Sequence, residues 1–219
     1  MRWRELKKMD KIYTWKECKK SNVFSVQDDK VRLRILCPED KEDYFSLYQE
    51  TSIVKKAMKT EEFREFFESQ WKEMELNNEE LNITILAQGT GEYAGNIRLN
   101  NLSSDTPEVG VDICSKYRRQ GIAYQSLRLF KKMVSDICGV AYYLVRIYSD
   151  NEASQGLFRK LGAVEIGKEP SEYQRFLNVL REELGNEEYE KIKTKNPDME
   201  KIAGSRYIKR YRLDVKHIS

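Results

Sequence analysis

The sequence predicts an α+β fold in which helices flank a mixed, mostly antiparallel central sheet. Three observations support it. Short segments of alternating apolar residues are separated by segments with apolar residues at three- and four-residue spacing. Two strand-like segments, 82–87 and 93–99, are joined by a short glycine-containing loop typical of a hairpin. Another, 107–113, leads through a basic turn into a helix-like segment, which predicts a parallel strand pair around that turn.

The composition is that of a soluble globular protein. The chain has 219 residues, of which 40% are hydrophobic and 34% are charged, which suits one large domain with a buried core. No apolar run approaches the length of a membrane span, and the charged start of the chain, 1–8, does not read as a secretory signal. We therefore expect a cytoplasmic protein with no membrane partner.

Charge and residue usage exclude several classes of function. The 39 basic and 36 acidic residues nearly balance, which argues against nucleic-acid binding. The four cysteines contain no C-x-x-C pair and the only histidine is His217, so we expect no metal site. A catalytic unit built on histidine is equally hard to assemble. Cys114 lies beside the basic turn, and we interpret it as a small packing residue.

The elements of the first half follow in order. Residues 1–29 form an N-terminal extension without a readable role, although its aromatic residues would suit an amphipathic helix. The segment 30–36 alternates and stops before Pro38, which predicts a strand followed by a helix with acidic residues in its first turn. From Glu61 a second helix is expected, whose aromatic stripe we assign to the core. The hairpin and the strand at 107–113 come next.

The second half is predicted to begin with a helix that starts at Ile122 and ends at Gly139. The remaining predicted elements are a central strand at 141–148, a helix at 149–162, a short strand at 163–166 and a final strand at 206–215. Between the last two strands, 169–206 is helical and charged and breaks at Gly185. We expect this insertion to form two short helices within a single domain spanning 30–219.

The basic turn at 117–123 is the most informative segment. A helix that begins here directs unpaired backbone N–H groups and the positive end of its dipole at the turn. Gly121 leaves space for the close approach of a ligand. The turn therefore predicts a site for an anion.

Four patterns in register connect this turn to a known family. Arg118, Gly121 and Ala123 match a phosphate-binding motif; 107–113 precedes it, and 150–154 and 157–162 follow it. In these patterns the chain resembles the GNAT superfamily of acyl-CoA-dependent N-acyltransferases, nearest to the ribosomal-protein N-terminal and polyamine acetyltransferase branch. The resemblance covers about 31–167 and the final strand, and leaves the extension and the insertion outside.

The resemblance implies acetyl-CoA as cofactor and assigns residues to it. The backbone N–H groups of the turn would wrap the diphosphate, and the strand before it would pair with the pantetheine arm, one N–H facing the thioester oxygen. For Arg118 and Arg119 the alternative is a solvated surface arginine, and for Asn151 it is a helix N-cap. The implied cofactor residues are Val111, Asp112, Ile113, Arg118, Arg119, Gln120, Gly121, Ile122, Ala123, Tyr124, Asn151, Ser154 and Phe158.

Two further positions concern the chemistry. Glu108 matches a position where some family members place a general base, with a solvent-facing strand residue as the alternative. Phe158 stands where many members have a tyrosine that protonates the leaving thiolate, and phenylalanine has no proton to donate. Tyr124, Tyr148, Tyr173 or water would replace it, or the thiolate leaves unaided.

We therefore expect an N-acetyltransferase that transfers acetyl directly to an amine in a ternary complex, without a metal or covalent intermediate. The acceptor is a small-molecule amine or a peptide N-terminus. Acidic residues of the insertion would favour a cationic amine if they overhang the acceptor. The alternative is a non-catalytic acyl-CoA sensor or interaction module of the same fold, which the phenylalanine at 158 would suit. A homodimer stays open.

Overall fold

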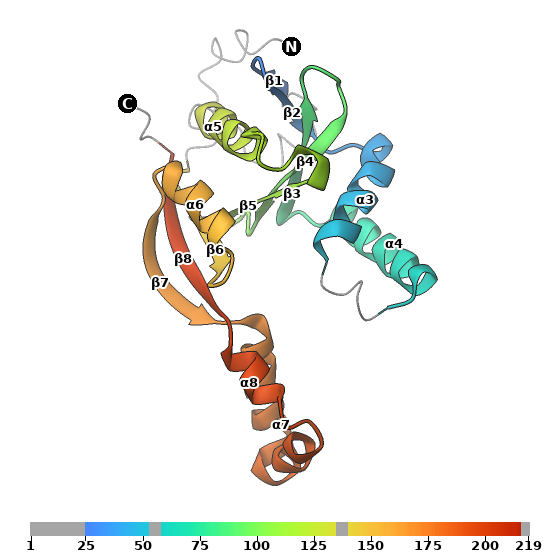
Figure 1. Cartoon of the computed structure of the whole chain (residues 1–219), viewed down its shortest axis with the longest axis vertical. Helices are drawn as coiled ribbons and strands as arrows, with labels where there is room; N and C mark the ends of the chain where they lie inside the picture. The colour runs from blue at the N-terminus through green and yellow to red at the C-terminus, as the bar shows by residue number, and fades with distance from the viewer. Residues whose placement is uncertain (1–24, 53–57, 135–139, 216–219) are drawn as a thin grey trace. The chain divides into compact units, whose positions relative to one another are not determined.

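The structure is a computed structural model that describes residues 25–52, 58–134 and 140–215 (Figure 1). The chain divides into two compact units, 1–143 with 214–219, and 144–213. The amphipathic helix suggested for 1–29 lies outside the described residues as far as 24, and 25–27 is a strand instead. The predicted helix end at Gly139 and His217 also lie outside the described residues. The described part is a mixed fold of helices and mostly antiparallel strands, as the sequence predicts.

The strands of the first unit follow one another in the order β1 to β5, and each neighbouring pair is antiparallel. The predicted hairpin is confirmed. Gly95 allows β4 to pair closely with β5, because a Cβ at this position would lie 2.2 Å from the carbonyl oxygen of Asp112. The sequence did not predict the first strand, which lies in the N-terminal extension. The bounds are β1 Ser25–Gln27, β2 Val31–Ile35, β3 Glu80–Ala87, β4 Tyr93–Asn100 and β5 Glu108–Ile113.

Helices cover both faces of this sheet: α3 and α4 lie on one side and α5 on the other (Figure 1). The aromatic stripe of α4 is core, with Phe63, Phe67 and Trp71 buried against rings of α3. Two 3-10 turns precede α3 and α5. The bounds are η1 Pro38–Asp40, α3 Lys41–Thr51, α4 Thr60–Leu76, η3 Ser115–Tyr117 and α5 Ile122–Val134.

The two faces differ in chemistry. Alternate residues of the strands form an apolar face, and Leu33, Ile83 and Ile97 on it are fully buried together with Phe130 of α5. The opposite face is polar yet largely covered. There Asp40 accepts hydrogen bonds from Arg34 at 2.6 Å and from Thr84 at 2.7 Å, so the buried carboxylate is satisfied.

The second unit holds a smaller set of strands, in the order β6, β8, β7, with β7 and β8 antiparallel. The strand predicted at 163–166 extends to Pro170, because 167–170 pairs with the last strand. The bounds are β6 Tyr142–Tyr148, whose first two residues belong to the first unit, α6 Glu152–Lys160, β7 Val164–Pro170, α7 Glu172–Lys195, α8 Met199–Gly204 and β8 Tyr207–Asp214.

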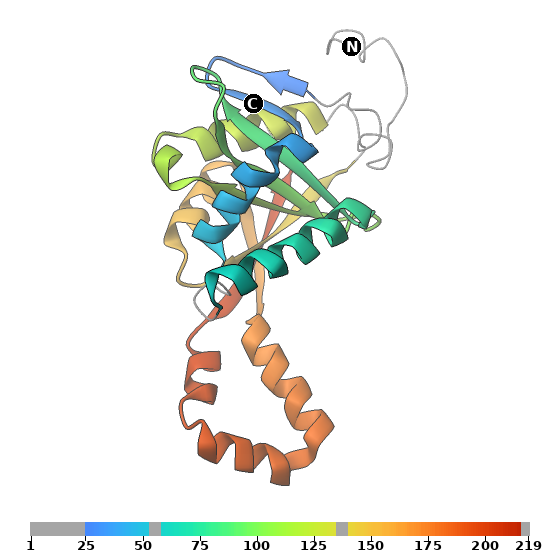
Figure 2. The ribbon, with the colours of Figure 1, turned by 90° about the vertical axis from the view of Figure 1, so that its right-hand side faces the viewer.

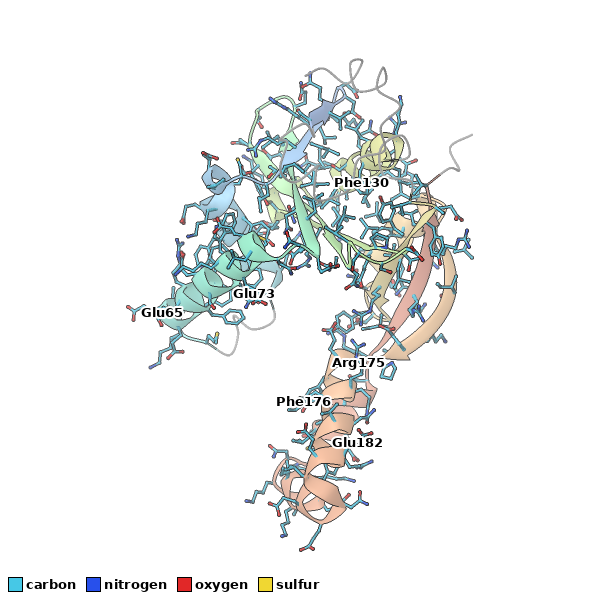
Figure 3. The ribbon with its side chains drawn as sticks, turned by 180° about the vertical axis from the view of Figure 1, so that it is seen from behind. Glu65, Glu73, Phe130, Arg175, Phe176 and Glu182 are labelled. Atoms are coloured by element: carbon cyan, nitrogen blue, oxygen red, sulfur yellow. The ribbon has the colours of Figure 1, made fainter. Side chains whose placement is uncertain are left out.

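Residues 172–204, here called the helical arm, run from the end of β7 to the start of β8 (Figure 2). The predicted break is present: Gly185 has φ 75° and interrupts α7. Leu177, Tyr189, Met199 and Ala203 form a small core of their own. Phe176 on α7 is 57% exposed (Figure 3). Among the described residues, no helix has the length and hydropathy of a membrane span.

Candidate functional site

The basic turn has an unusual backbone. Between η3 and α5 the chain adopts a left-handed conformation twice, at Arg119 (φ 60°) and at Gly121 (φ 79°). Glycine accepts this conformation without cost, whereas for arginine it is uncommon. Turns of this kind can bring successive N–H groups toward one point, which makes a concave site for an anion. The backbone observed here is therefore suited to the predicted role.

The start of α5 adds to this site. Its first hydrogen bond runs from the N–H of Gln125 to the carbonyl of Gly121, at 3.0 Å. The N–H groups of Ile122 and Ala123 precede that bond and fall outside the helical ladder. The first turn of α5 contains no acidic residue of its own, which favours an anion there. These features fit the diphosphate of a coenzyme A.

Side chains from other elements hold the turn in place. Tyr117, which is 8% exposed, donates a hydrogen bond to Glu92 in the β3–β4 loop, and Lys116 pairs with the same carboxylate at 2.6 Å. Arg118 is a surface arginine, 49% exposed, that is nevertheless tied to neighbouring elements: its Nε donates to the carbonyl of Ile113 at 2.9 Å and its Nη2 to Glu50 at 3.2 Å. The supporting residues Glu50 and Glu92 were missed by the sequence analysis.

On the polar face, β5 places Glu108 opposite Asn100 and Asp112 opposite Asn96. Arg98 of β4 lies among carboxylates, with its Nη2 3.6 Å from Asp112 Oδ2. Partial burial works against the charge of Arg98, but interactions with the Tyr44 hydroxyl and with the carboxylates of Asp112, Glu80 and Glu108 raise its pKa. Three carboxylates thus gather near one guanidinium on this face, an arrangement that would suit a cationic ligand. Arg98 was also missed.

Cys114 follows β5 directly and is half-buried. Its Sγ lies 3.8 Å from the carbonyl oxygen of Tyr93. Burial raises the pKa of the Cys114 thiol to about 11, so the thiolate is scarce at neutral pH. This environment fits the interpretation of Cys114 as a packing residue. Among the described residues, no group of histidine, cysteine or carboxylate side chains could hold a metal ion.

The predicted residues of the second unit lie at the start of α6 and along it. Asn151 is the N-cap, and its side chain accepts a hydrogen bond from the N–H of Ser154 at 3.0 Å. Asn151 therefore has the alternative role considered for it, that of a helix N-cap. Phe158 is 3% exposed. The structure thus gathers the predicted residues in two groups, 108–124 in the first unit and 151–158 in the second.

The three tyrosines proposed as proton donors have different surroundings. Tyr124 lies in the first turn of α5, directly after the basic turn. Tyr148 donates to Glu172 Oε2 at 3.2 Å, and burial together with this carboxylate raises its pKa, which makes it a weaker acid. Tyr173 stacks on Phe176 in the helical arm, with 6.4 Å between ring centroids.

Comparisons with known proteins agree with this geometry. The family model described as Acetyltransferase (GNAT) domain matches residues 30–164. No curated protein sequence matches. A spermidine/spermine N-acetyltransferase, SpeG from Vibrio cholerae, has a solved structure of similar fold, with 16% identity, a TM-score of 0.57 and coverage of 85% of this chain and 93% of that chain.

Two further structures from Vibrio cholerae are similar. One is a spermidine N-acetyltransferase in complex with CoA and spermine, with 16% identity, a TM-score of 0.55 and coverage of 66% of this chain and 87% of the other. The second is described as a putative ribosomal-protein-serine acetyltransferase, with 16% identity, a TM-score of 0.54 and coverage of 69% and 89%. At this identity the likeness concerns the fold, while the family model spans more than half of the sequence. The chain belongs to the GNAT acetyltransferase family.

Proposed function

We propose that this acetyl-CoA-dependent N-acetyltransferase acts on a small cationic amine, with Glu108 as the base that deprotonates it. The observation that carries the proposal is the set of carboxylates on the polar face of β3 to β5. Glu80, Glu108 and Asp112 act together on the single guanidinium of Arg98. An ammonium group is attracted to such a surplus of negative charge, and acetylation requires that one ammonium proton be removed.

The cofactor site in this proposal combines the turn and the strand before it. Acetyl-CoA supplies an acyl group activated as a thioester. The N–H groups of 119–123 hold its diphosphate, and the backbone of 111–113 aligns its pantetheine arm, with one N–H polarising the thioester carbonyl. Towards the cofactor only the main chain of 111–113 acts in this proposal, and the Asp112 carboxylate belongs to the cluster that attracts the amine.

The predicted residues of the second unit have roles of their own in this proposal. Asn151 already caps α6 with its side-chain oxygen, so a contact to the cofactor would come from its amide nitrogen or from Ser154. Phe158 supplies only apolar surface. For the leaving thiolate, Tyr124 is the better candidate donor because Tyr148 is held by Glu172 and has a raised pKa. The free thiols of Cys37 and Cys114 suit a reducing, cytoplasmic setting.

The relatives point to two acceptor classes. One similar structure contains spermine, and another protein is described as acting on ribosomal protein. The carboxylate cluster favours the first class, since several ammonium groups on one flexible chain can meet several carboxylates. A peptide N-terminus brings a single ammonium and needs a groove for its backbone.

The test is thiol release from acetyl-CoA by the full chain, with panels of diamines and polyamines, aminoglycosides and peptides with free N-termini. We expect turnover with di- and polyamines, and a KM for them that rises with salt as the carboxylates are screened. Turnover confined to peptides would overturn the acceptor class. Binding of acetyl-CoA without thiol release for any amine would favour the sensor alternative.

A further inference from the structure

Glu50 occupies a place that its own helix does not explain. It is one residue before the end of α3, where the helix dipole is negative and carboxylates are disfavoured. The last turn of α3 contains no basic residue that would compensate the charge. Its side chain is 34% exposed, so it is neither buried nor fully solvated. A stabilising role for this carboxylate must therefore come from outside α3.

The compensating contacts come from Ser115 of η3 and from Arg118 of the basic turn. Glu50 Oε2 accepts a hydrogen bond from the N–H of Ser115 at 2.7 Å, and Oε1 accepts one from Ser115 Oγ at 3.0 Å. Glu50 Oε2 also pairs with Nη2 of Arg118 at 3.2 Å. One carboxylate thus binds both ends of the segment 115–118, which lies more than sixty positions later in the sequence.

These contacts close a ring with the end of β5. Arg118 Nε donates to the carbonyl of Ile113 at 2.9 Å, and its backbone N–H donates to the carbonyl of Ser115 at 3.3 Å. One carboxylate and one guanidinium therefore make four hydrogen bonds that fix the path from β5 into the turn. Because Arg118 neutralises Glu50, the carboxylate does not place an uncompensated negative charge beside the anion site.

We propose that Glu50 is a positioning residue for the cofactor site. By holding Ser115 and Arg118 it sets the orientation of the N–H groups at 119–123 relative to the backbone of β5. Arg118 then works mainly as part of this clamp, not as an independent phosphate ligand. The inference rests on the proposed binding of the diphosphate by this turn. It adds a residue of α3, distant in the sequence, to those that determine the affinity for the cofactor.

The experiment compares Glu50→Ala and Glu50→Gln with Glu65→Ala, a control on the outer face of α4 (Figure 3). Calorimetry gives the Kd for coenzyme A, and steady-state kinetics give the KM for acetyl-CoA and kcat. We expect Glu50→Ala to raise Kd and KM about tenfold, because three charge-assisted contacts are lost, two to Ser115 and one to Arg118. At saturating acetyl-CoA, kcat should change less than about twofold. Glu50→Gln keeps an acceptor for Ser115 and should weaken binding about threefold.

A double-mutant cycle separates positioning from phosphate contact. If Glu50 and Arg118 form one clamp, Glu50→Ala with Arg118→Ala should bind coenzyme A no more weakly than the weaker single variant. Effects that multiply, or a Kd for Glu50→Ala equal to that of the control, would overturn the proposal. Thermal melting without ligand checks that the variants are folded. A wild-type protein that fails to bind coenzyme A would instead refute the proposed cofactor site itself.

Discussion

The basic turn and the helical arm are held in place in opposite ways. The turn depends on carboxylates from elsewhere in the chain, Glu50 of α3 and Glu92 of the β3–β4 loop. The arm depends mostly on its own residues: Glu200 pairs with Arg181 at 2.9 Å beside a core of arm residues, and Glu172 at its start contacts Tyr148 of β6. If the turn binds the cofactor as proposed, cofactor affinity should therefore be sensitive to changes at distant positions, whereas changes in the core of the arm should act locally.

The comparison also separates two kinds of effect. Changes around the turn should alter binding and turnover with little loss of stability, because the contacts there are few and partly exposed. Changes in the core of the arm should alter local stability and leave the turn as it is. Each substitution below is chosen to break or sharpen this distinction.

The largest effect is expected from Glu108→Gln. Glutamine keeps the size of the side chain but cannot accept a proton, so kcat should fall about 100-fold, in the usual range for loss of a general base. The Kd for coenzyme A should stay within about twofold, since in the proposed site the cofactor is held by backbone groups of the turn. Asp105→Asn, in the exposed loop before β5, is the matched control. An unchanged kcat would remove Glu108 from the mechanism.

Gly121→Val should weaken coenzyme A binding by about 30-fold, because φ 79° is strained for a β-branched residue and its side chain would intrude on the diphosphate. The protein itself leaves space there: a Cβ at Gly121 has no neighbour within 4 Å. Gly89→Ala, at a glycine with similar space and no positive φ, is the control. Normal binding by the valine variant, measured calorimetrically, would refute the assignment of the turn.

Leu177→Ala tests the independence of the arm. Leu177 is 3% exposed in the small arm core, and its truncation should cost about 2 kcal/mol of local stability, the lower end for a buried leucine. Hydrogen exchange should speed up across 172–204 but not in β2 to β5. Val179→Ala, 50% exposed on the same helix, should change little. If Leu177→Ala changes the Kd for coenzyme A, the arm and the cofactor site are energetically coupled and the contrast fails.

The turn was predictable from its sequence because its signals are local. Alternation at Val109, Val111 and Ile113 gave the strand, and Arg118 with Gly121 gave the basic turn at a helix start. In the arm, Gly185 marked the break for the same reason. The six-residue helix α8 was not separately predicted, since it is held by packing against residues such as Leu177 rather than by its own pattern.

The supports of the site could not be predicted, because contacts between distant positions leave no periodic trace. Neither Glu50 nor Glu92 stands out in its own segment. Arg98 was missed for another reason: alternation distinguishes the apolar face of β4 from the polar one, and a polar face is ordinarily taken as solvent-facing. Here that face buries Asn82, Thr84 and Asn96 and leaves Arg98 partly exposed among carboxylates, so the alternation was right although the face is not simply solvent-facing.

The smallest effect should come from replacing either supporting carboxylate that pairs at the surface. Hydrogen bonds from Lys116 and Tyr117 lower the pKa of Glu92, and one from Lys193 lowers the pKa of Glu200 in the arm. A lowered folded-state pKa means that each contributes stability above its unfolded value, near 4.5, which is lost as pH falls through the folded value.

Glu92→Gln and Glu200→Gln should therefore each lower the melting temperature slightly at pH 7, and the difference from wild type should vanish once the pH falls below the folded-state pKa. Only Glu92→Gln should also raise the Kd for coenzyme A, by about twofold, because only Glu92 anchors the residue next to Arg118. An equal effect of both variants on coenzyme A binding would mean that the arm and the turn are coupled, against the contrast drawn from their contacts.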